Sequence, residues 1–223
     1  MSLLDEIKES VVRGHINKDS NYPPDLMGKA GVEELVERAL NENLDVGEIL
    51  HHGLISGMQI VGEKFSNGDY FVPEMLFSAK TMKSGLKLLK PYLVSQNIST
   101  LGTIVIGTVE GDMHDIGKNL VGMMLEGGGF EVIDLGVNPS VKKFISAVEK
   151  YPDALVGMSA LLTITMEKMR GVIEAFRARG FKNKIFIGGA PVTERFAEEI
   201  GADGYAPDAS RAVRKARELL KIS

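Results

Sequence analysis

The second half of the chain alternates short apolar runs with amphipathic segments, and this pattern restricts the fold more than any other feature. Residues 102–108 are rich in β-branched side chains and bounded by glycines, as in a buried parallel strand, and the segment 119–126 that follows has helical periodicity. The alternation continues to the end of the chain. It predicts strands at 102–108, 130–135, 154–159, 184–188 and 203–206, and helices at 117–127, 139–150, 164–179, 192–200 and 208–220.

Five alternating units imply an α/β fold in which helices cover both faces of one parallel sheet. The most plausible arrangement is the flavodoxin-like (Rossmann-like) strand order 2-1-3-4-5. In that order the first and third strands are neighbours. The loops that follow them, which begin at Val109 and Ser159, should therefore lie side by side at the carboxyl edge of the sheet, where such folds bind ligands.

The first half of the chain is helical almost throughout. Apolar spacing predicts helices at 3–12, 32–41 and 46–65 and a fourth after Pro73, which suits the first turn of a helix because its missing N–H has no partner there. Gly14 should end the first helix. We therefore expect an antiparallel helical bundle domain at 1–93, a polar linker without periodicity at 94–101, and a sheet domain at 102–223.

Composition excludes several functions. The chain has no cysteine, so any metal must be held by histidine, carboxylates or a cofactor. The net charge is −4 and the basic residues are scattered, which argues against nucleic acid as a partner. The amino terminus is charged from Asp5 onward, and no segment reaches the roughly 18 apolar residues of a membrane helix, so we expect a cytoplasmic protein without a membrane partner.

The loop after the first strand holds the most informative residues. His114 lies between Asp112 and Asp115, and a carboxylate bonded to one imidazole nitrogen makes the other a better metal ligand. Gly117 removes a Cβ where a large planar ligand would approach the backbone. A phosphate-binding loop is excluded because five residues, not four, separate Gly111 from Gly117, and Asn119 replaces the hydroxyl that would hold magnesium.

Two further loops at the same edge carry small and hydroxyl-bearing residues. Thr163 and Thr165 stand just before a predicted helix, so they could either cap that helix or donate hydrogen bonds to a cofactor or to Asp112. The pair Gly188-Gly189 ends the fourth strand, where a tight turn alone would explain it.

These residues resemble the motifs of cobalamin-binding domains. The segment Asp112-Met113-His114-Asp115-Ile116-Gly117 resembles the Asp-x-His-x-x-Gly motif, Ser159-Ala160-Leu161 the Ser-x-Leu motif and Gly188-Gly189 the Gly-Gly motif, in the family's order and at similar spacing. With the helical segment upstream, the resemblance covers nearly the whole chain. It is closest to the two-domain corrinoid proteins of methylamine, methanol and methoxyl methyltransferase systems, which are similar to the B12-binding module of methionine synthase.

The resemblance implies a role for particular residues. His114 corresponds to the lower axial ligand of cobalt, and Asp112 and Thr165 to the residues that extend it into a hydrogen-bonded triad. The fourth helix of the bundle resembles the cap over the upper face of the corrin, where Phe71, Val72, Met75 and Leu76 are candidates. The cofactor-binding residues expected from the resemblance are Gly111, Asp112, Met113, His114, Asp115, Ile116, Gly117, Ser159, Leu161, Thr163, Gly188, Gly189, Tyr205, Ala206, Phe71 and Met75.

The implied function is that of a corrinoid methyl carrier that binds cobalamin base-off/His-on. It would be a subunit rather than a complete enzyme, serving a substrate:corrinoid methyltransferase, a corrinoid:thiol or corrinoid:tetrahydrofolate methyltransferase, and possibly a reductive activase. The sequence leaves methylamine, methanol and methoxyaromatic donors open. The alternatives are a cobalamin-based sensor, the cobalamin subunit of a mutase and, at the level of the fold, a flavodoxin-like FMN protein.

Overall fold

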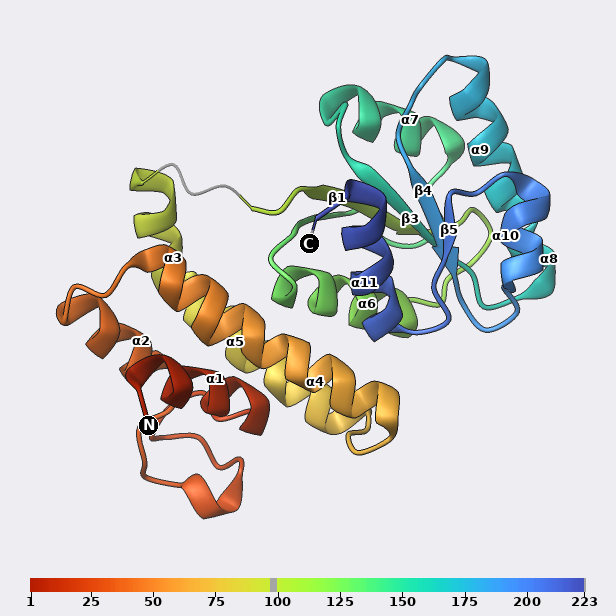
Figure 1. Cartoon of the computed structure of the whole chain (residues 1–223). Coiled ribbons are helices and arrows are strands. Elements are labelled where there is room, and N and C mark those ends of the chain that lie inside the picture. Colours follow the sequence, from red (N-terminus) through yellow and green to blue (C-terminus); the bar gives the residue numbers. More distant parts are fainter. Residues whose placement is uncertain (97–99, 223) are drawn as a thin grey trace. The chain divides into compact units, whose positions relative to one another are not determined.

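The chain divides into two compact units. The computed structural model describes residues 1–96 and 100–222. Contacts between Cα atoms separate Met1–Ser99 from Thr100–Ser223. The first unit is built from helices and the second contains a parallel sheet (Figure 1).

The first unit is a helical bundle, and its first helix ends where the sequence predicts. Gly14 adopts a left-handed conformation, with φ of 70°, and its N–H donates to the carbonyls of Ser10 and Val11, so it ends the first helix as predicted. The helical elements of this unit are α1 (Leu3–Arg13), η1 (Pro24–Leu26), α2 (Val32–Asn41), α3 (Val46–Glu48), η2 (Ile49–Ile55), α4 (Ser56–Asn67) and α5 (Val72–Ser95).

The segment predicted as one helix at 46–65 is interrupted by a π-helical stretch, η2, between α3 and α4. Gly53 packs so closely on α1 that a Cβ there would lie 2.9 Å from Ile7 Cγ2. The wider turn keeps Leu54 and Ile55 buried while His51 and His52 stay exposed. Helical spacing in the sequence predicts which side of the helix faces inward. It does not predict where an α-helix changes to a π-helix, because both kinds of helix bury similar residues over one or two turns.

Helix α5 begins as expected but ends later than expected. The N–H of Phe71 donates to Glu74 Oε2 at 3.0 Å, and Pro73 occupies the first turn. The helix continues through Ser95, so residues 94–95 are helical and not part of a linker. Residues 97–99 of the predicted linker lie outside the described residues.

The second unit contains a five-stranded parallel sheet in the order β2-β1-β3-β4-β5, which confirms the predicted fold class and strand order. Its strands are β1 (Thr103–Thr108), β2 (Glu131–Asp134), β3 (Leu155–Ser159), β4 (Ile185–Gly188) and β5 (Gly204–Tyr205). Strands β1 and β3 are paired so that Thr108 lies opposite Ser159. The loops that follow these two residues therefore leave the sheet at neighbouring points.

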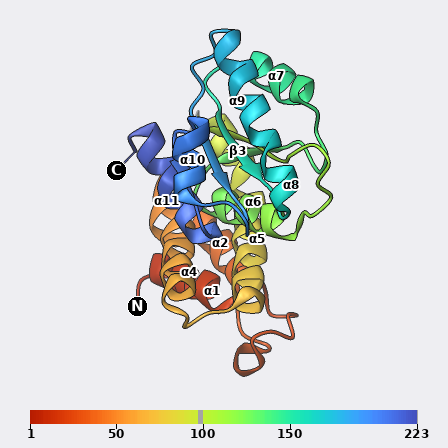
Figure 2. The same cartoon turned by 90° about the vertical axis from the view of Figure 1, so that its right-hand side faces the viewer.

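Helices cover both faces of the sheet. On one face, Phe144 of α7 and Phe176 of α9 belong to the same apolar core as Val105 and Val156, and α7 and α9 lie side by side (Figure 2). On the other face α6 and α11 pack together (Figure 1). The helices of this unit are α6 (Ile116–Gly127), α7 (Val141–Lys150), α8 (Thr163–Met166), α9 (Lys168–Ala178), α10 (Glu194–Ile200) and α11 (Ala209–Leu220).

The helix predicted at 164–179 is two helices. A turn at Glu167, with φ of −62° and ψ of −21°, separates α8 from α9. Thr165 in α8 bonds to the loop after β1, so this short helix follows the loop, whereas α9 packs on the sheet through Met169 and Phe176. No helix in the described part of the chain is both long and apolar enough to cross a membrane.

Two phenylalanines provide a matched test of this core. Phe176 is fully buried, whereas Phe71 is 67% exposed. We expect Phe176→Ala to lower the free energy of unfolding by roughly 3–5 kcal/mol because it leaves a cavity. Phe71→Ala should change it by less than about 0.5 kcal/mol. Urea titration followed by circular dichroism measures both, and equal effects would contradict the assignment of Phe176 to the core.

Candidate functional site

The loop that follows β1 reverses the chain tightly before α6 begins. Gly111 has φ of 84°, a conformation that favours glycine, and the N–H of Asp112 donates to the carbonyl of Val109 at 3.1 Å. The buried Thr108 hydroxyl donates to the carbonyl of His114 at 2.9 Å. The backbone of His114 is thereby attached to the end of the strand that the loop has just left.

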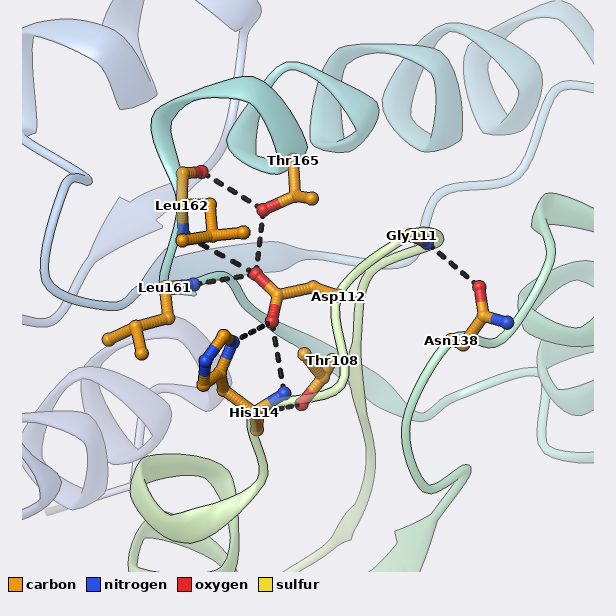
Figure 3. A network of polar contacts seen from close by, with 8 residues as sticks. All are labelled: Thr108, Gly111, Asp112, His114, Asn138, Leu161, Leu162 and Thr165. Carbon is orange, nitrogen blue, oxygen red and sulfur yellow. Dashed lines mark hydrogen bonds and ion pairs between the residues drawn. The ribbon is translucent and has the colours of Figure 1, made fainter.

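The carboxylate of Asp112 joins this loop to the loop after β3 (Figure 3). Its Oδ1 atom accepts from the backbone N–H of His114 at 3.0 Å and lies 2.8 Å from His114 Nδ1. Its Oδ2 atom accepts from Leu161 N–H at 2.8 Å and from the Thr165 hydroxyl at 2.6 Å. Asp112 and Thr165, which are 53 positions apart in the sequence, are thus hydrogen-bonded to each other.

Asp112 is ionised in this environment. Its side chain is fully buried, and burial alone would raise its pKa. Hydrogen bonds from Thr165, from the amide of Leu161 and from His114 outweigh that effect and hold the pKa of Asp112 well below the usual range. An ionised carboxylate only accepts hydrogen bonds, so the nearby ring nitrogen of His114 must be the donor.

This contact determines how the imidazole of His114 is presented. With the proton on Nδ1, the lone pair is on Nε2, which has no hydrogen-bond partner among the described residues. The side chain of His114 is 51% exposed. The arrangement offers one basic nitrogen to a ligand, held in orientation by a buried anion.

The loops after β1 and β3 carry large apolar side chains that are exposed. Ile116 is 80% and Ile164 76% exposed. Within the described part of the second unit, every exposed large apolar side chain lies on these loops or on the first residues of the helices that follow, and the set is Met113, Ile116, Leu161, Leu162 and Ile164. An apolar surface concentrated around one imidazole is typical of a ligand-binding site.

Other residues predicted in the first loop have distinct surroundings. The carboxylate of Asp115 bonds to Asn119 Nδ2 at 3.0 Å and not to the imidazole, so Asp112 alone orients His114. Gly117 is exposed, and no other atom lies within 4 Å of the position its Cβ would take. Its φ does not require glycine either, so the packing of the described chain does not account for this glycine.

The predicted residues at the ends of β3, β4 and β5 lie on the same edge of the sheet. Close packing of backbones explains both glycines, because a Cβ on Gly188 would lie 2.5 Å from the carbonyl oxygen of Ala206, and one on Gly189 1.9 Å from that of Ala160. Ala206 is buried and Tyr205 is partly buried, while Ser159 is partly exposed and Thr163 is exposed. Neither Thr163 nor Thr165 caps α8 through its side chain.

In the bundle, the two residues predicted to contact a cofactor differ in exposure. Phe71 precedes α5 and is exposed, as is Val72. Met75 is fully buried among the core residues of the bundle, and Leu76 is partly buried. The prediction for Met75 rested on the resemblance of this helix to the cap of corrinoid proteins, and helical spacing by itself is equally typical of a core position.

Sequence reasoning missed three residues that hold the first loop. Asn138, in the loop after β2, accepts a hydrogen bond from Gly111, and Lys118, although buried, bonds to Asp134. One signal was available. The second strand is expected beside the first, so its loop must reach the same edge, and asparagine is one of the few residues that favours the left-handed conformation found at Asn138.

Fold and site together define a doubly wound ligand-binding domain that offers one imidazole within an apolar surface, and comparison with known proteins shows which ligand it takes. Two family models, each described as a B12 binding domain, match residues 102–214 and 27–90. The chain is 38% identical over 99% of its length to a corrinoid protein of Desulfitobacterium hafniense, of which it covers 98%. It is 44% identical over 86% of its length to dimethylamine corrinoid protein 1 of Methanosarcina acetivorans, of which it covers 91%.

A solved structure agrees with these relatives. The methanol:cobalamin methyltransferase complex of Methanosarcina barkeri contains a chain with a TM-score of 0.80 and 27% identity, and the match covers 99% of this chain and 80% of that one. The chain therefore belongs to the family of B12-binding corrinoid proteins, and its cofactor is cobalamin.

The residues at the site fit this cofactor. Imidazole nitrogen is a donor that suits cobalt, and His114 Nε2 is exposed with no hydrogen-bond partner among the described residues. The exposed apolar side chains match a large planar macrocycle. The open space at Gly117 leaves room for it at the start of α6.

The charge of Asp112 should be visible in the pH dependence of stability. Its pKa in the folded protein lies below the unfolded value, so its contribution is complete above the ordinary aspartate pKa of about 3.9 and is lost as pH falls through the folded pKa. At neutral pH we expect Asp112→Asn to lower the free energy of unfolding by about 2 kcal/mol, because hydrogen bonds to a charge are lost.

That difference between the wild type and Asp112→Asn should narrow in acid, and urea titrations at a series of pH values test it. Asp203→Asn provides the control, since Asp203 is also a carboxylate of lowered pKa but bonds to Lys184 and Ile185. Only Asp112→Asn should change the nitrogen chemical shifts of the His114 ring. A stability difference that does not depend on pH would contradict the ionised state of Asp112.

Proposed function

We propose that this protein is a methyl carrier, a corrinoid subunit that presents cobalamin to separate methyltransferases. The proposal is supported by relatives named as dimethylamine and trimethylamine corrinoid proteins and by the similarity to a chain in a methanol:cobalamin methyltransferase complex. The observation that carries it is the exposed imidazole of His114 held by buried Asp112.

In this proposal His114 Nε2 is the lower axial ligand, and cobalamin binds base-off with its own nucleotide displaced. When bound, cobalamin supplies a cobalt atom that accepts a methyl group from one partner and gives it up to another. The bond from His114 Nδ1 to Asp112 would hold the imidazole toward the cofactor. The bond from the Thr108 hydroxyl to the His114 carbonyl would hold the backbone that carries it.

Asp112 and Thr165 would hold this imidazole in one tautomer and one orientation. Nδ1 carries a proton that it donates to Asp112 Oδ1 at 2.8 Å, which leaves the lone pair of Nε2 to hold the metal. The Thr165 hydroxyl donates to Oδ2 of the same carboxylate, so the three side chains form one connected unit.

Two further surfaces complete the proposed binding site. The corrin's lower face would rest on Met113, Ile116, Leu161 and their neighbours, with the nucleotide tail along the sheet edge at Ser159, Thr163, Gly188, Gly189, Tyr205 and Ala206. Phe71 and Val72 of the bundle would cover the upper face and exclude water from it. Because a methyltransferase must reach the same face, the bundle would have to move away from it.

The protein would then be a carrier and not an enzyme on its own. A substrate:corrinoid methyltransferase would load it, and a corrinoid:thiol or corrinoid:tetrahydrofolate methyltransferase would unload it. A reductive activase would restore the cofactor after oxidation. We propose that the protein works in the cytoplasm, with a helical bundle domain followed by a cobalamin domain at 102–223.

Reconstitution tests the axial role of His114. After anaerobic loading with hydroxocobalamin and reduction to Co(II), the wild type should show nitrogen hyperfine splitting by EPR, and His114→Ala should lose it while retaining part of the cofactor through the tail. His52→Ala is the matched control, because His52 is an exposed histidine in the bundle. Splitting that persists in His114→Ala would overturn the assignment.

The proposed cover can be tested without a methyltransferase. Phe71→Ala should let cyanide bind severalfold faster to the protein loaded with hydroxocobalamin, because a large side chain no longer shields the upper face; visible absorption follows the reaction. Met27→Ala removes another exposed apolar side chain of the bundle and should leave the rate unchanged. Identical rates in Phe71→Ala and the wild type would show that Phe71 does not cover the cofactor.

A further inference from the structure

The segment between β2 and α7 touches the His114 loop at its beginning. Asn138 Oδ1 accepts from the N–H of Gly111 at 2.8 Å (Figure 3). The N–H of Asn138 donates to the carbonyl of Asp112 at 3.2 Å. Both bonds reach residues within three positions of His114. Asn138 is exposed and belongs to neither of the two loops that Asp112 joins.

Asp134, the last residue of β2, is tied to the first turn of α6, just beyond the end of that loop. The buried ammonium of Lys118 bonds to Asp134 Oδ2 at 2.5 Å and to Asn119 Oδ1 at 2.6 Å. Asn119 Nδ2 in turn bonds to Asp115 Oδ2 at 3.0 Å. A continuous series of polar contacts therefore runs from the end of β2 to the residue that follows His114.

The segment is itself well anchored. The N–H of Leu135 donates to the carbonyl of Ile106 at 2.8 Å, and the N–H of Thr108 donates to the carbonyl of Gly136 at 3.0 Å. Asn138 has φ of 53°, which few residues other than glycine adopt readily. A residue keeps such a backbone conformation only when the surrounding structure holds it there. The anchored segment and the bond to Gly111 do this for Asn138.

We propose that Asn138 is a positioning residue for His114, and that the end of β2 and the segment after it hold the His114 loop at both ends so that the imidazole keeps a fixed reach toward the metal. This inference rests on the proposed axial role of His114. Asp112 orients the ring, whereas Asn138 fixes the backbone that carries Asp112 and His114. A metal ligand whose support is loosened coordinates more weakly, because its position is no longer prepared in advance.

Two variants of Asn138 separate the hydrogen bond from the backbone conformation. Asn138→Gly removes the acceptor and tolerates positive φ, so it introduces no strain. Asn138→Asp keeps an oxygen in place and should restore the bond to Gly111. Asn183→Ala is the control for stability alone, because Asn183 Nδ2 bonds to the carbonyls of Pro152 and Ala154, away from the His114 loop.

The first measurement needs no cofactor. Amide hydrogen exchange by NMR should show faster exchange at Gly111 in Asn138→Gly and exchange close to that of the wild type in Asn138→Asp. The second measurement is the EPR spectrum of protein loaded with Co(II) cobalamin. In Asn138→Gly the ratio of molecules without nitrogen splitting to molecules with it should rise about fivefold, the factor that one hydrogen bond is typically worth.

The outcomes distinguish this inference from the proposed function. If the wild type itself shows no nitrogen splitting, the axial role of His114 fails. If the wild type shows splitting and Asn138→Gly shows it in the same proportion, the positioning role of Asn138 fails while the axial role stands. A change of the same size in Asn183→Ala would also overturn it. Should Asn138→Gly not fold, Asp134→Asn, which disrupts the contact at the other end, must raise the same ratio.

Discussion

The site depends on one fully buried carboxylate. Asp112 stays ionised without exposure to water because donors from two loops point at it: the amide and ring of His114 on one side, the amide of Leu161 and the hydroxyl of Thr165 on the other. Those loops meet because β1 and β3 are adjacent in the sheet. A change in strand order would leave the charge of Asp112 without these donors. The ionised carboxylate at the site therefore requires this topology of the sheet.

Polar contacts and apolar surface have separate tasks at this edge of the sheet. The polar contacts are internal and hold backbone and imidazole in place, whereas the outward surface is made of large apolar side chains and a glycine with open space beside it. A protein that had only to fold would bury those side chains. Their exposure around one basic nitrogen is what suits a planar macrocycle with a metal at its centre, and it agrees with the match to B12-binding domains.

Support for the imidazole comes from three strands and not only two. The loop follows β1, and the chain after β3 supplies donors to Asp112. The end of β2 and the segment after it bond to residues on either side of His114. The proposed axial role requires an imidazole that keeps a fixed position. The loop is bonded to the chain at the ends of both strands that flank β1. A displacement of His114 would stretch these hydrogen bonds, so they favour its return to the same position.

Much of this could be predicted from the sequence. Alternating periodicity determined the class of fold and the strand order, Gly14 marked the end of a helix, and the residues around His114 marked the site, because each depends on neighbours in the chain. Only the tertiary structure decided that Met75 faces the bundle core, that the helix after β3 breaks at Glu167, that Asp112 and not Asp115 orients the imidazole, and that Asn138 holds the loop. The physical reason is that periodicity records which side of an element is buried, whereas hydrogen bonds between residues tens of positions apart depend on how the elements are arranged in space.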